Sequence, residues 1–304
     1  MHAISIFVED LFYKPNIYHK TLSFLLLPFS YIYCLIVYIK YNFSKEQNFN
    51  IPIISVGNLS VGGSGKTPLT IALASPFSQS AIILRGYGRQ SQGLHVVSDG
   101  ESILCDVHVS GDEAMIYAKK LPNSVVIVSE DRVKAIHKAK ELGCKVVFLD
   151  DGYSKHFIKK LDILIDVKSE NKNCLPAGPF RERLWSGKRV RVVADGVDFT
   201  KSTKLIDKTS RMALATAIAK PYRLKPFLPN IVGELIATDH YYFNKRELEE
   251  FMQNVNASSL LVTYKDLVKI EEFNLKTTLL DLEYSISDTL KNEVKFYIES
   301  FDFQ

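Results

Sequence analysis

Residues 57–67 read GNLSVGGSGKT, and this stretch indicates the fold class. The apolar run IPIISV precedes it and the helix-compatible run LTIALA follows it, which is the order strand, glycine-rich loop, helix. Glycines let the backbone N–H groups of such a loop converge on phosphate oxygens, and the N-terminus of the next helix adds its positive dipole end. The stretch therefore predicts a phosphate-binding loop, and with its Gly-Lys-Thr ending a plain turn at a strand end is disfavoured.

Six residues of this loop are expected to bind nucleotide phosphates. Lys66 would reach the β- and γ-phosphates, and the hydroxyl of Thr67 would coordinate Mg²⁺. The strict pattern G-x-x-x-x-G-K-[ST] fails at one place, because Ser60 stands where the first glycine belongs. Two adjacent glycines compensate in part. The predicted phosphate-binding set is Gly62, Gly63, Ser64, Gly65, Lys66 and Thr67.

A second predicted strand ends in two carboxylates. Residues 146–149 are Val-Val-Phe-Leu, and Asp150 and Asp151 follow them. A carboxylate at the carboxyl end of a buried parallel strand lies beside the phosphate loop, where the metal of a bound nucleotide sits. Such a pair could instead only cap a turn. Together with the loop at Lys66, it predicts that Asp150 and also Asp151 hold Mg²⁺ with Thr67, and it leaves open which of the two is the direct ligand.

Outward from the loop, short β-branched runs alternate with helical stretches, as in an α/β protein with a parallel sheet. Residues 171–200 carry prolines and glycines and read as a loop and linker, and a second α/β block follows. The predicted fold is α/β, with a P-loop NTPase-like parallel sheet lobe, a smaller second α/β lobe and a hydrophobic N-terminal helix. The predicted domains are 1–45, a membrane-associated helical segment; 46–200, the P-loop nucleotide-binding domain; and 201–304, the second lobe. Strands are expected at 51–56, 81–84, 124–128, 145–149, 163–167, 211–219, 231–237, 259–263 and 277–282. Three helices are expected to begin near Lys66, Asp112 and Asp131, and a fourth is expected at 245–254.

The N-terminal region contains an uncharged run. Residues 22–39 read LSFLLLPFSYIYCLIVYI between Lys20 and Lys40. About 18 apolar residues is the lower limit for crossing a bilayer, and Pro28 with two serines weakens a straight spanning helix. The tyrosines favour the headgroup layer, which suits a ring with a polar tip. Three interpretations are open: an interfacial or shallowly inserted helix, which is favoured, a true span, and a buried core helix.

Composition limits the function classes. With 304 residues, 46% hydrophobic and 24% charged, the chain has the composition of a folded protein. A net charge of +4 is too small to indicate a nucleic-acid partner, and no protein partner is implied. The cysteines are far apart and form no C-x-x-C pair, so neither a zinc site nor a disulfide framework is suggested, and a reducing cytoplasm fits. We expect all four cysteines to be buried as small apolar side chains: Cys34, Cys105, Cys144 and Cys174.

Six further motifs follow the phosphate loop along most of the chain. They are LRGYGR at 84–89, GDEA at 111–114, LDDG at 149–152, LPAGPFRE at 175–182, TDHYYF at 238–243 and TYKD at 263–266. Together with VGNLSVGGSGKTPL at 56–69, their residues and their order resemble the tetraacyldisaccharide 4′-kinases of lipid A synthesis. The similarity includes the serine in place of the first glycine. A single tetrapeptide is a weak signal, but seven motifs in register are a strong one.

The resemblance implies Mg-ATP as the phosphoryl donor. The acceptor it implies is the 4′-hydroxyl of a tetraacylated glucosamine disaccharide 1-phosphate, which gives lipid IVA. It also implies two α/β lobes joined by a hinge, and an N-terminal helix docked peripherally or shallowly on the cytoplasmic face of the inner membrane. From the residues themselves, TYKD at 263–266 only approximates the guanine signature N-K-x-D, so ATP is favoured over GTP.

Two residues of these motifs match the family's catalytic pair. Asp112 in GDEA corresponds to the catalytic aspartate, and His240 in TDHYYF to the histidine that partners it. A sugar hydroxyl is a poor nucleophile, and such a pair would remove its proton as the phosphoryl group arrives. Since the two lie in different blocks, closure of the lobes is expected to bring them together. Without the family resemblance, Asp112 would be interpreted as a helix N-cap and His240 as an ordinary loop histidine. The predicted catalytic residues are Asp112, His240 and Lys66.

Glu182 in PFRE matches a family acidic residue that can approach the nucleotide metal. Basic residues cluster around it, and Arg85 and Arg89 follow the second predicted strand. They could bind the substrate's 1-phosphate or anionic headgroups, or they could form only a solvated basic face. The chain departs from the family pattern after LDDG, where a glutamine is missing, so His156 does not inherit the role of the family histidine. The basic cluster is Arg181, Arg183, Lys188, Arg189 and Arg191.

Other function classes also use a phosphate loop. A membrane-tethered ATPase or GTPase, acting as a switch or a metallochaperone, would hydrolyse nucleotide without a lipid. A nucleotide-binding scaffold without chemistry would keep its function after Asp112→Ala. A soluble kinase of small molecules would leave the uncharged run at 22–39 without a reason.

Overall fold

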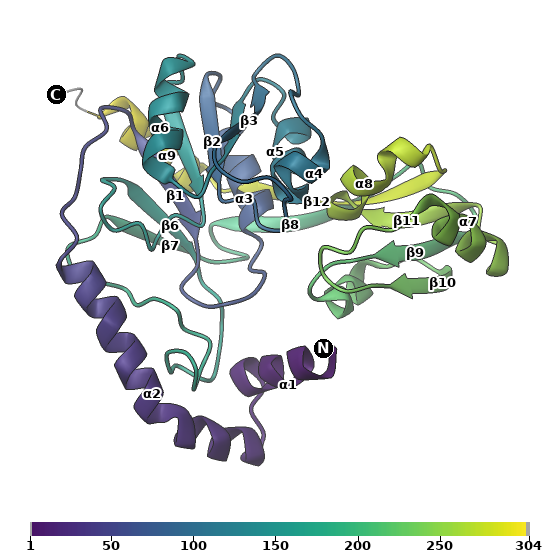
Figure 1. Ribbon diagram of the computed structural model, residues 1–304, viewed down its shortest axis with the longest axis horizontal. Coiled ribbons are helices and arrows are strands. Elements are labelled where there is room, and N and C mark those ends of the chain that lie inside the picture. Colours follow the sequence, from purple (N-terminus) through teal and green to yellow (C-terminus); the bar gives the residue numbers. More distant parts are fainter. Residues whose placement is uncertain (1, 302–304) are drawn as a thin grey trace.

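The larger lobe is built around the strand that precedes the glycine-rich loop. The computed structural model describes residues 2–301, with side chains from residue 7 onward. Its seven-stranded sheet has the order β3-β4-β2-β5-β1-β6-β7, and every neighbouring pair is parallel except β3 with β4 (Figure 1). The strands are β1 (Ile53–Gly57), β2 (Ser80–Leu84), β3 (His95–Asp99), β4 (Val125–Val128), β5 (Val146–Asp150), β6 (Leu161–Ile165) and β7 (Val190–Val193).

Helices cover both faces of this sheet, which is why its central strands are continuous apolar runs. One face packs its core against three helices, α3, α5 and α9, and the other packs against α6. The short helix α4 leads into α5. These helices are α3 (Lys66–Ala74), α4 (Val107–Ser110), α5 (Asp112–Lys120), α6 (Arg132–Glu141) and α9 (Asp288–Glu299).

The central strands and the helix starts near Lys66, Asp112 and Asp131 confirm the predictions for this lobe. Two edge strands were not predicted. β7 lies inside 171–200, so the prediction that this whole segment is loop and linker is wrong. Edge strands are hard to see in sequence because their side chains are only partly covered, as they are in β7, and because β3 pairs on one side only.

The smaller lobe holds a five-stranded sheet in the order β10-β9-β11-β12-β8. Four predicted strands and the predicted helix at 245–254 are present, and β8 is an addition with alternating exposed side chains. A separate apolar core lies between this sheet and its helices. The elements are β8 (Phe199–Ile206), β9 (Met212–Thr216), β10 (Ile231–Ile236), β11 (Ser259–Thr263), β12 (Thr277–Ile286), α7 (Lys245–Asn254), α8 (Tyr264–Ile270), and the 3₁₀ helices η1 (Pro221–Phe227) and η2 (Glu271–Phe273).

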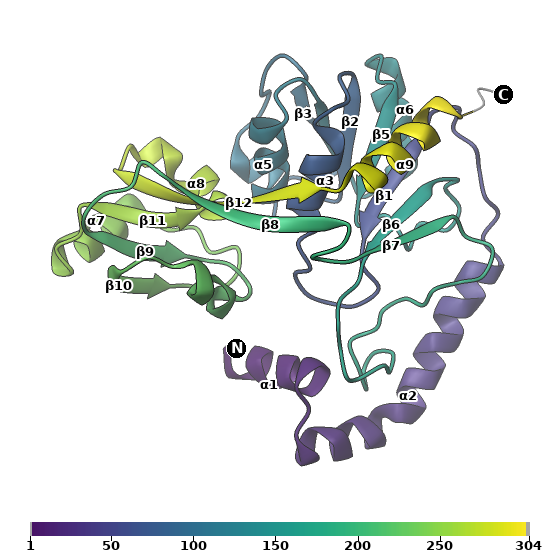
Figure 2. The ribbon, with the colours of Figure 1, turned by 180° about the vertical axis from the view of Figure 1, so that it is seen from behind.

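β8 and β12 form an antiparallel ribbon that joins the two lobes (Figure 2). They pair from Phe199 with Ile286 to Ile206 with Leu279. α9 follows β12 and returns to the larger lobe, where Leu290 enters its core. We propose the division at 46–200 and 201–304 as the framework of two lobes, with α9 as the segment that fastens the second to the first.

Two helices precede the larger lobe: α1 (His2–Tyr13) and α2 (Ile17–Asn42). α2 has 26 residues and is long and apolar enough to cross a membrane, by length and composition only. Its large apolar side chains face outward, and Phe24, for example, is 71% exposed. The buried side instead includes Ser23 and Ser30, which donate hydrogen bonds to the carbonyls of Ala177 and Cys174. The interpretation of this run as a buried core helix is therefore wrong.

One expectation about the cysteines is also wrong. Cys34 of α2 and Cys174 form a disulfide bond, whereas the sequence suggested none. The two are 140 residues apart, and no local spacing signals their pairing. Only the docking of α2 on the segment at 174–177 brings them together. Cys105 and Cys144 are free. Cys144 and Cys174 are buried as expected, whereas Cys34 and Cys105 are only half-buried, so the expected burial is wrong for these two.

Candidate active site

The phosphate loop connects β1 to α3 at the carboxyl end of the sheet. Two of its glycines have a left-handed backbone, Gly62 with φ +100° and Gly65 with φ +85°. A Cβ on Gly65 would also meet the hydroxyl of Tyr284, so another residue there would need both a strained backbone and a shift of this tyrosine. Ser60 is buried and forms an antiparallel bridge with Phe180. An extended residue needs no glycine, which explains the one deviation from the strict motif.

Lys66 is the first residue of α3. Its ammonium is 3.2 Å from Oδ1 of Asn58, the same oxygen that the guanidinium of Arg181 approaches at 3.3 Å. Asn58 itself donates to the carbonyl of Ser60 at 2.7 Å. The asparagine therefore holds the cation of Lys66 beside the loop backbone.

Asp150 and Asp151 end β5, directly beside β1, where Val56 is the partner of Asp150. Asp150 is buried; its Oδ2 accepts a hydrogen bond from Tyr117 at 3.0 Å, while its Oδ1 has no hydrogen-bond partner. Burial raises the pKa of Asp150 in spite of the nearby charge of Lys66. Burial also acts to raise the pKa of Asp151, but the charges of Lys66 and Arg181 prevail and lower it.

This carboxylate pair has the chemistry of a magnesium site. No group of three or more His, Cys, Asp or Glu side chains among residues 7–301, whose side chains the structure describes, could hold a metal ion by itself. Mg²⁺ does not require one, because it is bound through one or two carboxylates and keeps waters and phosphate oxygens as its other ligands. The buried, unpaired Oδ1 of Asp150 fits such an ion.

Asp112 and His240 meet across the two lobes. Oδ2 of Asp112, at the start of α5, is 2.9 Å from Nδ1 of His240, which lies 128 residues later in the smaller lobe. Asp112 is only 2% exposed. His240 has a left-handed backbone, φ +61°, and its amide donates to the carbonyl of Ala217 at 3.2 Å. The structure thus brings together the two residues that the family resemblance singles out.

Two charged neighbours complete this cluster, and sequence reasoning missed both as functional candidates. Nζ of Lys265 lies 3.7 Å from Asp112 Oδ2 and 2.9 Å from Asp239 Oδ1. Asp239 in turn lies 3.6 Å from Nε2 of His240. The motifs TDHYYF and TYKD contain these residues, so the signal was present, but only the fold shows that Lys265 faces the aspartate. Burial acts to raise the pKa of Asp112, yet the hydrogen bond with His240 and the charge of Lys265 prevail and lower it.

A cleft of about 170 Å³ lies between the phosphate loop and the ends of β2 and β5. Glu113, next to Asp112, lines it, and burial together with the charge of Asp150 raises the pKa of Glu113 to about 7. The cleft is rich in cations, of which Arg132 was not a sequence candidate. Its charged lining is Lys66, Arg85, Glu113, Glu130, Arg132, Asp150, Asp151, Lys155 and Arg181.

The basic cluster predicted around Glu182 is dispersed in the fold. Only Arg181 reaches the cleft. Lys188 is buried against Asp162 at 3.3 Å, and Arg191 pairs with Asp198 and Glu293. Arg183 and Arg189 stack over the rings of Phe180 and Tyr297, and Arg89 pairs with Glu130. The fold therefore does not gather the five residues at one common surface.

Glu182 is buried next to His156. Its Oε2 is 3.4 Å from His156 Nε2 and 3.3 Å from the indole nitrogen of Trp185. Glu182 and Asp151 both line a cavity of about 220 Å³ beside α2. The glutamate thus lies on the α2 side of the carboxylate pair, and the shifted histidine after LDDG still packs against it.

The Asp112–His240 pair makes the chain's stability depend on pH in a defined window. The hydrogen bond with Asp112 raises the pKa of His240 above its ordinary 6.5. The pair's stabilisation is therefore complete between pH 3.8 and 6.5, and it is lost as the pH rises through the raised pKa of His240 or falls through the lowered pKa of Asp112. Asp112→Asn is expected to lower the imidazole pKa of His240 in an NMR titration, while the signal of His137 on α6 stays unchanged. An equal midpoint for His240 in both proteins would show that the pair is not formed.

The comparisons with known proteins all match the same enzyme family. A family model described as tetraacyldisaccharide-1-P 4′-kinase, LpxK, matches residues 22–299. The chain is 44% identical to the tetraacyldisaccharide 4′-kinase of Aliarcobacter butzleri, over 98% of each chain. It is 44% identical to that of Helicobacter pylori strain J99, over 97% of this chain and 96% of the relative. In structure it resembles crystalline LpxK from Aquifex aeolicus in complex with ATP, with a TM-score of 0.73 and 27% identity over 91% of this chain and 99% of that one.

Proposed function

The chain belongs to the tetraacyldisaccharide-1-P 4′-kinase family, and we propose how its own residues carry out that family's reaction. It is an ATP-dependent kinase of lipid A biosynthesis that phosphorylates the 4′-hydroxyl of tetraacyldisaccharide 1-phosphate to give lipid IVA. The observation that carries the assignment of roles is the Asp112–His240 pair, whose members come from different lobes and lie 2.9 Å apart.

Asp112 is the proposed general base. Its carboxyl stays ionised at neutral pH, so it can take the proton of the 4′-hydroxyl while that oxygen bonds to the γ-phosphorus. The O–P bond to the sugar forms, the bond to the β-phosphate breaks, and ADP leaves. His240 orients the carboxylate through its hydrogen bond, and Lys265 stabilises its charge from 3.7 Å.

The nucleotide is proposed to bind at the N-terminus of α3. Backbone N–H groups of residues 62–67 would face the phosphates, and Lys66 would contact the β- and γ-phosphates. Thr67, Asp150 and Asp151 would hold Mg²⁺, which neutralises charge on the phosphate oxygens when it is bound. The unpaired buried oxygen of Asp150 supports this placement, and Glu182 shares a cavity with Asp151, which makes it a proposed acidic neighbour of the ion.

α2 is proposed to keep the active site at the membrane surface, on the cytoplasmic face of the inner membrane where ATP is available. The helix buries its serines against the protein and turns its large apolar side chains outward, the reverse of a helix that packs into a soluble core. An acylated acceptor resides in a membrane, so an apolar surface beside the catalytic lobe suits it.

Removing two of these outward side chains is expected to weaken membrane binding. Leu25 and Phe29 are one helical turn apart on α2 and are 64% and 61% exposed. Each apolar side chain transferred from water to an apolar medium contributes about 1.5–3 kcal/mol, so Leu25→Ser with Phe29→Ser should lower partitioning into phospholipid vesicles by more than about tenfold. Cosedimentation measures it, and Phe296→Ser, an equally exposed change on α9, is the control. Unchanged cosedimentation of the α2 variant would rule out this face as the anchor.

The reaction is tested by transfer of labelled γ-phosphate from ATP, with Mg²⁺, to tetraacyldisaccharide 1-phosphate in detergent micelles. We expect labelled lipid to accumulate, and to do so only when the acceptor is present. Hydrolysis of ATP that needs no lipid, without labelled lipid, would instead favour an ATPase of the switch type and contradict the proposed role of Asp112 and His240.

A further inference from the structure

In its glycine-rich part, residues 61–65, the phosphate loop receives hydrogen bonds from side chains that lie outside the loop. Gly62, Gly63 and Gly65 give it the conformations it needs, but glycines also leave a loop with many alternatives to its binding shape. A phosphate cradle requires its N–H groups to point inward, and its carbonyls must then point outward. Something outside the loop must hold those carbonyls if the cradle is to be formed before nucleotide arrives.

Two side chains from distant parts of the chain bind these carbonyls. The hydroxyl of Tyr13, the last residue of α1, donates to the carbonyl of Val61. The guanidinium of Arg223, in η1 of the smaller lobe, donates to the carbonyl of Gly63 at 2.6 Å. The carbonyl of Val61 belongs to the peptide group before the left-handed Gly62, and that of Gly63 to the peptide group after Gly63. Neither of these two peptide groups can turn over without breaking a hydrogen bond.

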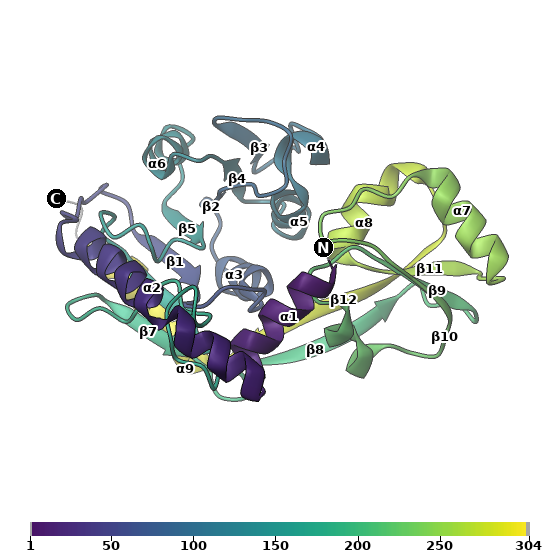
Figure 3. The same ribbon diagram turned by 60° about the horizontal axis from the view of Figure 1, so that its bottom comes forward.

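The two holding elements are also joined to each other. Glu9 of α1 accepts from Tyr222 of η1 and lies 2.6 Å from the ammonium of Lys220. That ammonium also lies 4.7 Å from the ring centroid of Tyr13. These contacts place α1 beside η1 at the loop, although the two elements are some 200 residues apart in sequence (Figure 3).

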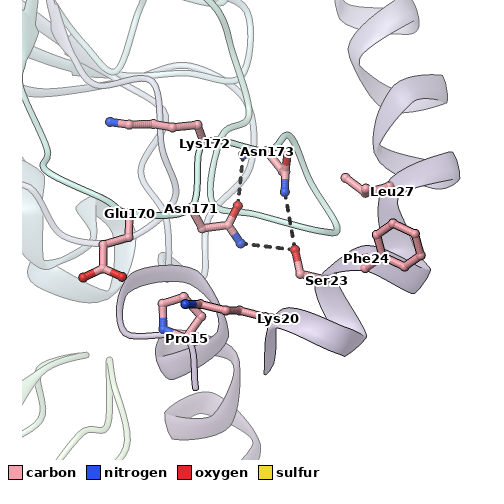
Figure 4. A pocket seen from close by; sticks show the side chains of 9 residues that line it. All are labelled: Pro15, Lys20, Ser23, Phe24, Leu27, Glu170, Asn171, Lys172 and Asn173. Carbon is pink, nitrogen blue, oxygen red and sulfur yellow. Dashed lines mark hydrogen bonds between the residues drawn. The ribbon is translucent and has the colours of Figure 1, made fainter. Parts of the chain in front are cut away.

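The C-terminal turn of α1, which carries Tyr13, is also fastened to the segment at 169–173, close to α2. Ser169 donates to the carbonyl of Phe12 at 2.9 Å, and Asn171 approaches the carbonyl of Leu11 at 3.4 Å. Figure 4 shows Asn171 and Asn173 pointing toward Ser23 of α2, at the wall of a pocket of about 370 Å³. The last turn of α1 thus contacts both the phosphate loop and the segment that holds Ser23 of α2.

We propose that Tyr13 and Arg223 are positioning residues that pre-form the phosphate loop for ATP, one from the N-terminal helix pair and one from the smaller lobe. The proposal rests on the nucleotide site assigned above. This proposal gives a role to the contact between the smaller lobe and the phosphate loop. It also predicts that the affinity for ATP depends on the position of α1. These residues act through the loop backbone and are not assigned a contact with the transferred phosphoryl group.

The test is equilibrium binding of a fluorescent, non-hydrolysable ATP analogue with Mg²⁺ and without lipid acceptor. A hydrogen bond lost from a loop carbonyl, neutral in one case and charged in the other, predicts affinities about fivefold weaker for Tyr13→Phe and about tenfold or more weaker for Arg223→Gln. In the transfer assay, KM for ATP should rise by similar factors and kcat should change by less than about threefold. Tyr13→Phe removes a single oxygen atom, so it leaves the packing of α1 intact.

Matched controls remove the same groups elsewhere. Tyr18→Phe changes an exposed tyrosine of α2, and Arg246→Gln changes an exposed arginine of α7; both should bind the analogue as the wild type does. Variants at Tyr13 and Arg223 that bind with wild-type affinity would overturn the positioning role. A fall of kcat beyond about a hundredfold with unchanged affinity would overturn it too, since it would mean that Arg223 contacts the reacting group. If the wild type itself binds no analogue, the nucleotide site is what fails.

Discussion

Asp112→Asn is expected to lower kcat for phosphoryl transfer by at least about a hundredfold, the lower end of the range for a lost general base. Asparagine has the same shape and can still accept a hydrogen bond from His240, so the change removes charge and basicity while the packing stays. Asp112 begins α5, outside the phosphate loop, so KM for ATP should change little. Initial rates at varied ATP, with saturating lipid acceptor in micelles, separate the two constants.

Asp288→Asn is the matched control for this experiment. Asp288 begins α9 as Asp112 begins α5, but its side chain is 91% exposed and lies outside the cleft. The control should keep the wild-type kcat. An Asp112→Asn enzyme with kcat within tenfold of the wild type would show that the hydroxyl loses its proton to another group, and the half-buried Glu113, whose pKa is raised to about 7, would be the next candidate.

Lys66→Ala is expected to lower kcat/KM for ATP by at least about a hundredfold, and unlike Asp112→Asn it should also raise KM for ATP. Lys66 and Arg132 both act on Asp150 and Asp151, and the ammonium of Lys66 has the larger effect on each carboxylate. Without this ammonium, one positive charge fewer offsets the repulsion between the two carboxylates and the negatively charged triphosphate. Both ground-state binding and stabilisation of the transition state therefore suffer.

Lys245→Ala is the control for the loss of a lysine. Lys245 begins α7 and is 54% exposed, and its removal should leave both constants unchanged. Initial rates over a range of ATP concentrations give KM, and binding of the nucleotide analogue gives affinity without chemistry. Wild-type affinity and wild-type kcat in Lys66→Ala would remove this residue from the site altogether.

The phosphate loop and the fold class could be predicted because the information is local. Strand, glycine-rich loop and helix follow one another at 53–74, and a few consecutive residues are enough to indicate the conformation of each. The position of Asp150 beside the loop followed from the rule that neighbouring parallel strands end at the same edge, and β1 does lie next to β5. The roles of the site residues stay predictions until the variants are measured.

Other features depend on contacts that no local pattern encodes. Asp112 and His240 are 128 residues apart and Cys34 and Cys174 are 140, and such pairs meet only when whole elements pack. Lys265, Tyr13 and Arg223 look like ordinary surface residues in the sequence, and the predicted basic cluster looks like a unit although its members face different ways in the fold. Whether a side chain serves the site is set by its direction and its burial. Both arise from the packing of the two lobes and the N-terminal helices, because side chains become buried when separate elements pack against each other and not when a single element forms.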